Sequence, residues 1–206
     1  MKKQNIEHII RAVADAIEEK ELYIIGSQSI FGQHPNIENM LSQLKKEGKI
    51  DKKDIANILG SREADIMAIS DDTKAKITKS DIIEGVLGEL SPYHETFGYY
   101  ADGVNEDTAK LPYDWQDRLN VICNENTRWV TAYCLDTHDI ITAKLFANRE
   151  KDINYIRSLI RAGLVDETTV HERLDKVNID QTENGDKIVR NAHAMITKIF
   201  NELKNE

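Results

Sequence analysis

Apolar residues recur at helical spacing near the start of the chain, where Ile6, Ile10 and their neighbours in the pattern are separated by three or four positions. This spacing places them on one face, so residues 5–20 are predicted to form an amphipathic helix. Two shorter apolar runs follow at 22–25 and 64–69, and both are bounded by glycine or serine. Runs of this length with such boundaries are typical of β-strands.

The next part of the pattern predicts further helices. Two short ones are expected within 36–60, and another is expected to start at Asp81 with Ser80 as its N-cap and to end at Ser91-Pro92. More strands are predicted in three stretches rich in aromatic and β-branched residues: 93–100, 118–122 and 129–135.

Beyond residue 137 the helical pattern returns and continues to the end of the chain. We therefore predict an α+β fold with two parts. An α/β core occupies residues 1–136, and a helical C-terminal region, residues 137–206, packs on that core.

Charge and length limit the possible functions. The formal net charge of the 206 residues is −9, which argues against a surface built for duplex DNA, since such a surface needs clustered Lys and Arg.

The start of the chain lacks the apolar segment of a signal peptide, and no apolar stretch reaches about 18 residues. A cytoplasmic protein without a membrane partner is expected. Cys123 and Cys134 form no CxxC unit, so we expect buried thiols and no zinc site.

The strongest chemical signal combines Gly26-Ser27, at the end of a predicted strand, with Glu63-x-Asp65 in a later one. Residues two apart in a strand point to the same face, so the two carboxylates converge. A hard cation such as Mg²⁺ relieves their repulsion, while Gly26 and the Ser27 hydroxyl allow a phosphate to approach. Taken alone, Gly-Ser is usually only a turn, and Glu-x-Asp is usually a solvated strand edge.

The order of these motifs resembles the signature of the DNA polymerase beta-like nucleotidyltransferase superfamily. Over roughly residues 20 to 175 the chain is more specifically similar to a bacterial family of uncharacterised nucleotidyltransferase-like proteins. The residues that carry this resemblance are Ile24-Ile-Gly-Ser-Gln28, Glu63-Ala-Asp-Ile66, 91–100, Leu111-Pro112, Trp115, Arg118-Leu119, Leu135-Asp-Thr-His-Asp139, Lys144 and Arg149-Glu-Lys-Asp152.

The resemblance implies a mixed β-sheet flanked by helices, with two Mg²⁺ ions, or Mn²⁺, held by acidic residues on adjacent strands. Glu63 and Asp65 match the first two of these catalytic carboxylates. The third is expected on a following strand, where Asn120 stands in place of an acid and where Asp117 fits only in a different register. The resemblance also suggests a toxin–antitoxin or phage-defence setting with a partner protein.

Other candidate residues divide into two groups. Gly26, Ser27, Gln28, Lys144 and Arg149 are candidates for nucleotide binding. Lys144 stands within an apolar helical stripe, where a Lys is usually either ion-paired or bound to phosphate. A possible substrate pocket is formed by His94, Glu95, Tyr99 and Asp139. The alternatives are a hairpin with core aromatics around Tyr99 and ordinary helical ion pairs around Lys144.

The predicted function is therefore an Mg²⁺-dependent nucleotidyltransferase that moves a nucleoside monophosphate from ATP or another nucleoside triphosphate to a protein or RNA acceptor. The alternative is a catalytically impaired nucleotide-binding regulatory or protein-interaction module, which the unplaced third acid favours. A purely structural interaction protein would have no affinity for nucleotides.

Overall fold

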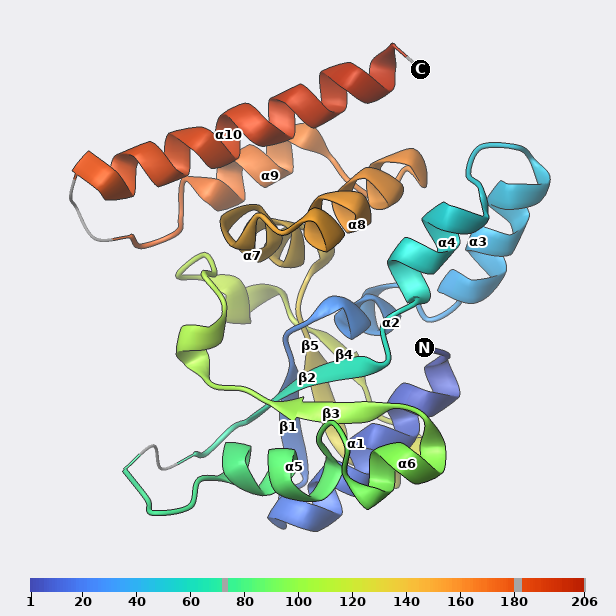
Figure 1. Ribbon diagram of the computed structural model, residues 1–206, viewed down its shortest axis with the longest axis vertical. Helices are drawn as coiled ribbons and strands as arrows, with labels where there is room; N and C mark the ends of the chain where they lie inside the picture. The colour runs from blue at the N-terminus through green and yellow to red at the C-terminus, as the bar shows by residue number, and fades with distance from the viewer. Residues whose placement is uncertain (72–73, 180–182, 206) are drawn as a thin grey trace. The chain divides into compact units, whose positions relative to one another are not determined.

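The computed structural model describes residues 1–71, 74–179 and 183–205, with the backbone alone described at 183–184 (Figure 1). The strands are β1 (Glu21–Ile24), β2 (Glu63–Ala68), β3 (Tyr100–Gly103), β4 (Asn120–Ile122) and β5 (Thr131–Cys134). The α-helices are α1 (Lys3–Ile17), α2 (Ile30–Gln33), α3 (Ile37–Lys46), α4 (Lys52–Leu59), α5 (Lys79–Leu87), α6 (Pro92–Phe97), α7 (Thr137–Ala147), α8 (Glu150–Arg161), α9 (Glu167–Leu174) and α10 (Glu183–Lys204). Short 3₁₀ helices are η1 (Ser27–Ser29), η2 (Glu106–Thr108), η3 (Trp115–Arg118) and η4 (Glu125–Thr127).

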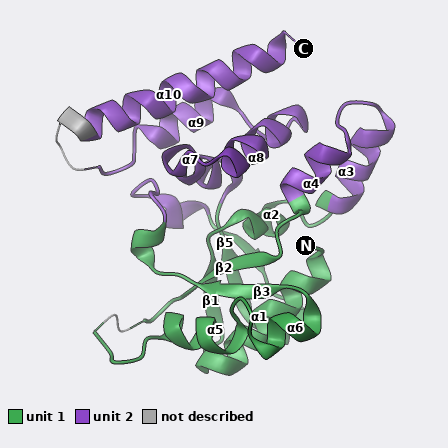
Figure 2. Cartoon of the chain, viewed as in Figure 1, with its two compact units in different colours: residues 1–37, 59–108, 119–135 green, residues 38–58, 109–118, 136–206 purple. Residues whose placement is uncertain are grey.

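The chain divides into two compact units (Figure 2). Unit 1 comprises Met1–Ile37, Leu59–Thr108 and Leu119–Leu135, and unit 2 comprises Glu38–Ile58, Ala109–Arg118 and Asp136–Glu206. Unit 1 contains all five strands, whereas unit 2 is helical. Unit 2 includes two segments that precede residue 136 in the chain. The predicted division of the chain at residue 136 stays a prediction.

The sheet of unit 1 is mixed, and its strands lie in the order β3-β2-β1-β5-β4. β1 pairs in antiparallel fashion with β2 and in parallel with β5. The outer pairs are β2 with β3, which are parallel, and β4 with β5, which are antiparallel. This arrangement confirms the predicted α+β fold with a mixed sheet flanked by helices.

Helix α1 supplies much of the core of unit 1. The apolar stripe predicted from the sequence is buried, because Ile6, Ile9, Ile10 and Val13 are completely inaccessible to solvent. The helix packs on α5 and on the sheet (Figure 1). Burial of four large aliphatic side chains contributes roughly 1.5–3 kcal/mol each to folding, so this stripe is a main reason that the sheet holds a helix on this side.

Three predictions about the middle of the chain are wrong. Residues 93–97 belong to helix α6 and not to a strand, because the Ser91 side chain accepts a hydrogen bond from the His94 backbone N–H and Pro92 occupies the first turn. Ser91-Pro92 thus begins a helix instead of ending one. Thr78, not Ser80, caps α5, since its hydroxyl accepts from the backbone N–H of Asp81.

Two other sequence predictions can be compared with the structure. Cys134 is buried as expected, whereas Cys123 is exposed. Among the described residues, no helix has both the length and the apolar character that crossing a membrane requires.

Candidate metal and nucleotide site

Three carboxylates meet on one face of the β2–β3 ladder. Asp65 of β2 is directly paired with Asp102 of β3, and Glu63 lies two residues before Asp65 on the same face of its strand. One carboxylate oxygen from each of these residues lies within 4.8 Å of the others. Ala64 and Ile66, which alternate with the acids, point to the opposite face and are completely buried. The alternation that forms the strand therefore also gathers the acids, which we call the carboxylate trio.

Asp102 is a third acid beside Glu63 and Asp65 that the sequence analysis did not identify. Asn120 lies in β4, at the opposite edge of the sheet from β3, and Asp117 lies in η3 of unit 2. Neither lies beside β2 in the sheet, so neither of the two positions considered in the sequence is next to Glu63 and Asp65. A usable signal was present, because Tyr100-Ala-Asp102 alternates as a half-buried strand should. The strand predicted over 93–100 ended before Asp102, whereas β3 runs from Tyr100 to Gly103, so this acid was left outside the predicted strand.

Gly26 lies directly against the Asp65 carboxylate. A Cβ atom on Gly26 would be only 1.5 Å from Oδ2 of Asp65, and the backbone N–H of Ile25 donates to the carbonyl of Asp65 at 3.1 Å. The φ of Gly26 is −97°, so glycine is required here for the close approach and not for an unusual backbone conformation. The Gly26-Ser27 turn and the carboxylate trio are therefore neighbours within unit 1.

Ser27 and Gln28 follow in the short helix η1. The Gln28 side chain is fully buried, with Nε2 donating to the Ser27 hydroxyl at 3.4 Å. Oε1 of Gln28 has no hydrogen-bond partner among the described residues. Helices η1 and α2 contain three and four residues, so an anion at this turn would depend on the Gly26-Ser27 backbone and hydroxyl and not on a helix dipole.

The trio lies in an acidic environment. Burial, followed by a hydrogen bond to Glu84 and the negative charge of Glu84, raises the pKa of Asp102 to about 6. Burial and the charges of Glu63 and Glu89 raise the pKa of the neighbouring Tyr100 to about 12. Burial is the largest cause of both shifts, and the charges of Glu84, Glu63 and Glu89 add to it, so negative charge gathers at the β3 edge of the site.

The raised pKa of Asp102 predicts that Mg²⁺ stabilises the protein more at about pH 7.5 than at about pH 5. In the absence of metal, the folded state holds the proton of Asp102 more tightly than the unfolded state does. This difference stabilises the fold fully below the unfolded-state pKa of about 4, and the stabilisation is lost as the pH rises through the folded-state pKa of about 6. Mg²⁺ requires the ionised form and must displace the proton at the lower pH. Thermal unfolding with and without Mg²⁺ across this range measures the effect, and Asp102→Asn should remove its pH dependence. An equal Mg²⁺-induced shift at both pH values would contradict it.

The predicted substrate-pocket residues do not form one group. The His94 ring packs on Tyr100 with their centroids 4.7 Å apart, whereas the Tyr99 hydroxyl lies 2.8 Å from Nδ1 of His8 in α1. Glu95 is exposed on α6. Asp139 belongs to unit 2, where it is completely buried and ion-paired with Arg118 at 2.9 Å.

Lys144 and Arg149 both belong to unit 2 and share one partner there. Nζ of Lys144 and Nε of Arg149 lie 2.7 and 2.6 Å from the two oxygens of Asp152, whose side chain is completely buried. Lys144 also lies 4.9 Å from the centre of the Tyr155 ring. Lys144 is therefore ion-paired, but with a residue of the next helix, α8, and not with one four residues away on its own helix. A phosphate-binding role for Lys144 and Arg149 stays a prediction.

Replacing Lys144 by Met should reduce the free energy of unfolding by about 1.5–3 kcal/mol, the range for a hydrogen bond to a charged group. The reason is that Asp152 would keep only Arg149 as a cationic partner. Chemical denaturation measures this effect. The matched control is Lys198→Met on α10, because the Lys198 side chain is 75% exposed and its ion pair with Glu202, which spans 3.8 Å, should contribute little. Equal stability of the two variants would show that the buried pair is not structural.

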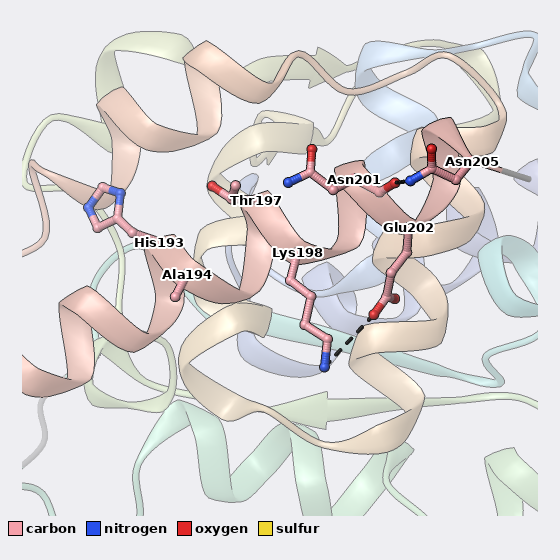
Figure 3. A pocket seen from close by; sticks show the side chains of 7 residues that line it. All are labelled: His193, Ala194, Thr197, Lys198, Asn201, Glu202 and Asn205. Carbon is pink, nitrogen blue, oxygen red and sulfur yellow. Dashed lines mark hydrogen bonds and ion pairs between the residues drawn. The ribbon is translucent and has the colours of Figure 1, made fainter.

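A separate hollow lies along one helix of unit 2 (Figure 3). Its lining consists of six α10 residues and the residue that follows the helix end: His193, Ala194, Thr197, Lys198, Asn201, Glu202 and Asn205. None of the residues predicted for catalysis or nucleotide binding is among them. The carboxylate trio therefore remains the site at which chemistry is expected.

A family model described as "Nucleotidyltransferase of unknown function (DUF6036)" matches residues 4–204. No curated protein and no solved structure matches the chain.

Proposed function

Because the chain belongs to this family of nucleotidyltransferases of unknown function, we propose that it is an Mg²⁺-dependent enzyme that transfers a nucleoside monophosphate from a nucleoside triphosphate to a hydroxyl group. The observation that carries the proposal is the carboxylate trio, with its oxygens within 4.8 Å of one another. The acceptor is a protein or an RNA. A toxin–antitoxin or defence setting stays a prediction from the resemblance.

The donor set of the trio fits a hard divalent cation. Carboxylate oxygens are the ligands that Mg²⁺ and Mn²⁺ prefer, and the set contains no thiol or imidazole that would favour a softer metal. Glu63, Asp65 and Asp102 would hold the ions. Bound there, the ions supply Lewis-acid activation of the attacking oxygen and charge stabilisation of the departing pyrophosphate.

The residues of unit 1 bind and orient the substrates. Gly26 lets the Asp65 carboxylate lie directly against the Gly26-Ser27 turn, and the Ser27 hydroxyl can donate to a phosphate oxygen. The acceptor oxygen attacks the α-phosphorus, the bond from that phosphorus to the bridging α–β oxygen breaks, and pyrophosphate leaves. The acceptor's proton passes to water. The products are a phosphodiester on the acceptor and free pyrophosphate.

The alternative function, an impaired regulatory module, depended on a missing third acid. Asp102 provides a third carboxylate beside the other two, so that argument no longer supports it. The alternative now predicts nucleotide binding without transfer, a difference that a transfer assay measures directly.

Two measurements test the proposal. Mg²⁺ together with one or more of the four nucleoside triphosphates should raise the midpoint of thermal unfolding, because a ligand that binds only the native state stabilises it. α-Labelled triphosphate should then leave label on an acceptor and release pyrophosphate. Failure of all four triphosphates to stabilise the protein would contradict the proposal, and stabilisation without transfer to any acceptor would favour the regulatory module.

A further inference from the structure

The order of the strands separates two sides of the carboxylate trio. Gly26 lies against Asp65 at the end of β1, whereas Asp102 and Tyr100 lie on β3, and β2 runs between these two strands. In an in-line displacement the attacking and leaving oxygens lie on opposite sides of the phosphorus. If the triphosphate is held at Gly26-Ser27, as the proposed function requires, the acceptor approaches from the β3 side.

An aromatic pair is positioned on that side. Tyr100 is directly paired with Glu63 across the ladder, so both side chains project from the face that carries the trio. The ring of His94 packs on Tyr100 from helix α6, as their 4.7 Å centroid separation shows. Neither the Tyr100 hydroxyl nor Nε2 of His94 hydrogen-bonds to any residue that the structure describes.

One backbone N–H group orients the ring of His94. Nδ1 accepts a hydrogen bond from the Leu90 N–H at 3.1 Å, so a neutral His94 carries its proton on Nε2. Leu90 has a φ of 63°, which is unfavourable for a leucine, and its side chain is 80% exposed. This backbone conformation holds the Leu90 N–H against the imidazole. The Nε2–H donor of His94 and the Tyr100 ring therefore lie on the β3 side of the carboxylate trio, from which the acceptor would approach.

The charges around the pair are negative. Beyond the carboxylate trio, whose charge the metal ions would neutralise, Glu89 places negative charge near both Tyr100 and Asp102, and Glu84 places it near Asp102. An RNA end carries phosphodiester charges next to its terminal hydroxyl, and these would be repelled. A polypeptide hydroxyl flanked by Lys or Arg would be attracted to the same place.

We propose that His94 and Tyr100 bind the acceptor, and that the acceptor is a protein hydroxyl next to basic residues and not an RNA end. The inference rests on the proposed function and specifies its acceptor. The hydroxyl oxygen of Ser, Thr or Tyr bonds to the α-phosphorus, the bond from this phosphorus to the bridging α–β oxygen breaks, and pyrophosphate leaves while water takes the proton. His94 donates through Nε2 to an oxygen of the bound peptide.

The test compares three acceptor pools with Mg²⁺ and α-labelled triphosphates. The first pool contains short peptides with one Ser, Thr or Tyr flanked by lysines, the second has glutamates in place of the lysines, and the third contains short RNAs with free 3′-hydroxyls. We expect label in the lysine-flanked peptides at about ten times the level in either other pool, and a smaller preference at high salt.

Variants identify the residues responsible. His94→Ala should lower transfer to the lysine-flanked peptides about tenfold, as expected for one lost hydrogen bond, with the triphosphate-induced thermal shift unchanged. His94→Gln, which retains a donor, should recover part of the rate and also covers the case in which the alanine variant folds poorly. Thr96→Ala, an exposed neighbour on α6, is the matched control.

The outcomes distinguish this inference from the function on which it rests. Preferential labelling of RNA, or label in no pool although triphosphate stabilises the protein, overturns the assignment of a protein acceptor. Full transfer activity in His94→Ala overturns the role of His94. Absence of any stabilisation by the triphosphates instead contradicts the proposed function itself.

Discussion

Replacing Asp65 by Asn is expected to lower the rate of nucleotidyl transfer by about 100-fold or more, because a metal ligand contributes several kcal/mol of transition-state stabilisation. Asp65 is the central member of the trio, paired across the ladder with Asp102 and in contact with the Gly26 backbone. The variant should fold normally, since an amide has nearly the same shape and the change removes one of three repelling charges. Transfer of label from α-labelled triphosphate measures the rate, and thermal unfolding measures the fold.

The matched control is Asp15→Asn, which makes the same chemical change at a side chain of unit 1 that is 70% exposed and whose ion-pair partner among the described residues is the exposed Arg128. It should leave the transfer rate unchanged. Transfer by Asp65→Asn at the wild-type rate would place the chemistry at another site.

Gly26→Ala is expected to be comparably damaging, although it adds only one methyl group. The new Cβ would lie 1.5 Å from Oδ2 of Asp65, so the carboxylate or the turn must move. Displacement of a catalytic group by about 1 Å can lower the rate by about 100-fold, and overpacking should also cost about 1–3 kcal/mol of stability. The transfer rate and chemical denaturation measure these two effects.

Gly85→Ala provides the opposite control. Gly85 lies within helix α5, and a Cβ there would meet no atom within 4 Å. Alanine should therefore stabilise the protein by about 0.5–1 kcal/mol and leave transfer unchanged. If Gly26→Ala behaved in the same way as Gly85→Ala, the contact between the turn and Asp65 would have no functional importance.

Periodicity predicted most of the elements of the fold. The stripe from Ile6 to Ile17 identified α1, and the runs that end near Gly26 and Ala68 identified β1 and β2, two of the interior strands of the sheet. The prediction failed at 93–97, where aromatic side chains suggested a strand. The capping hydroxyl of Ser91 and the proline after it determined a helix instead. Local capping chemistry there outweighs β-propensity.

The site was predicted less completely than the fold. Glu63 and Asp65 were found because their spacing of two is a property of a single strand. Asp102 was not found, because its place depends on the parallel register between β2 and β3, which only tertiary structure fixes. Lys144 was identified as a Lys within an apolar stripe, but its partner Asp152 is one helix further along the chain. Such pairings between separate elements cannot be read from periodicity.

The most direct test of the carboxylate trio as a metal site is a crystal of the protein soaked with Mn²⁺ and a non-hydrolysable nucleoside triphosphate. Anomalous scattering locates the ion without any assumption about its ligands. We expect a peak bound to carboxylate oxygens of Glu63, Asp65 and Asp102, with the triphosphate at Gly26-Ser27. An Mn²⁺ peak bound elsewhere, or none at these three residues, would contradict the proposed site.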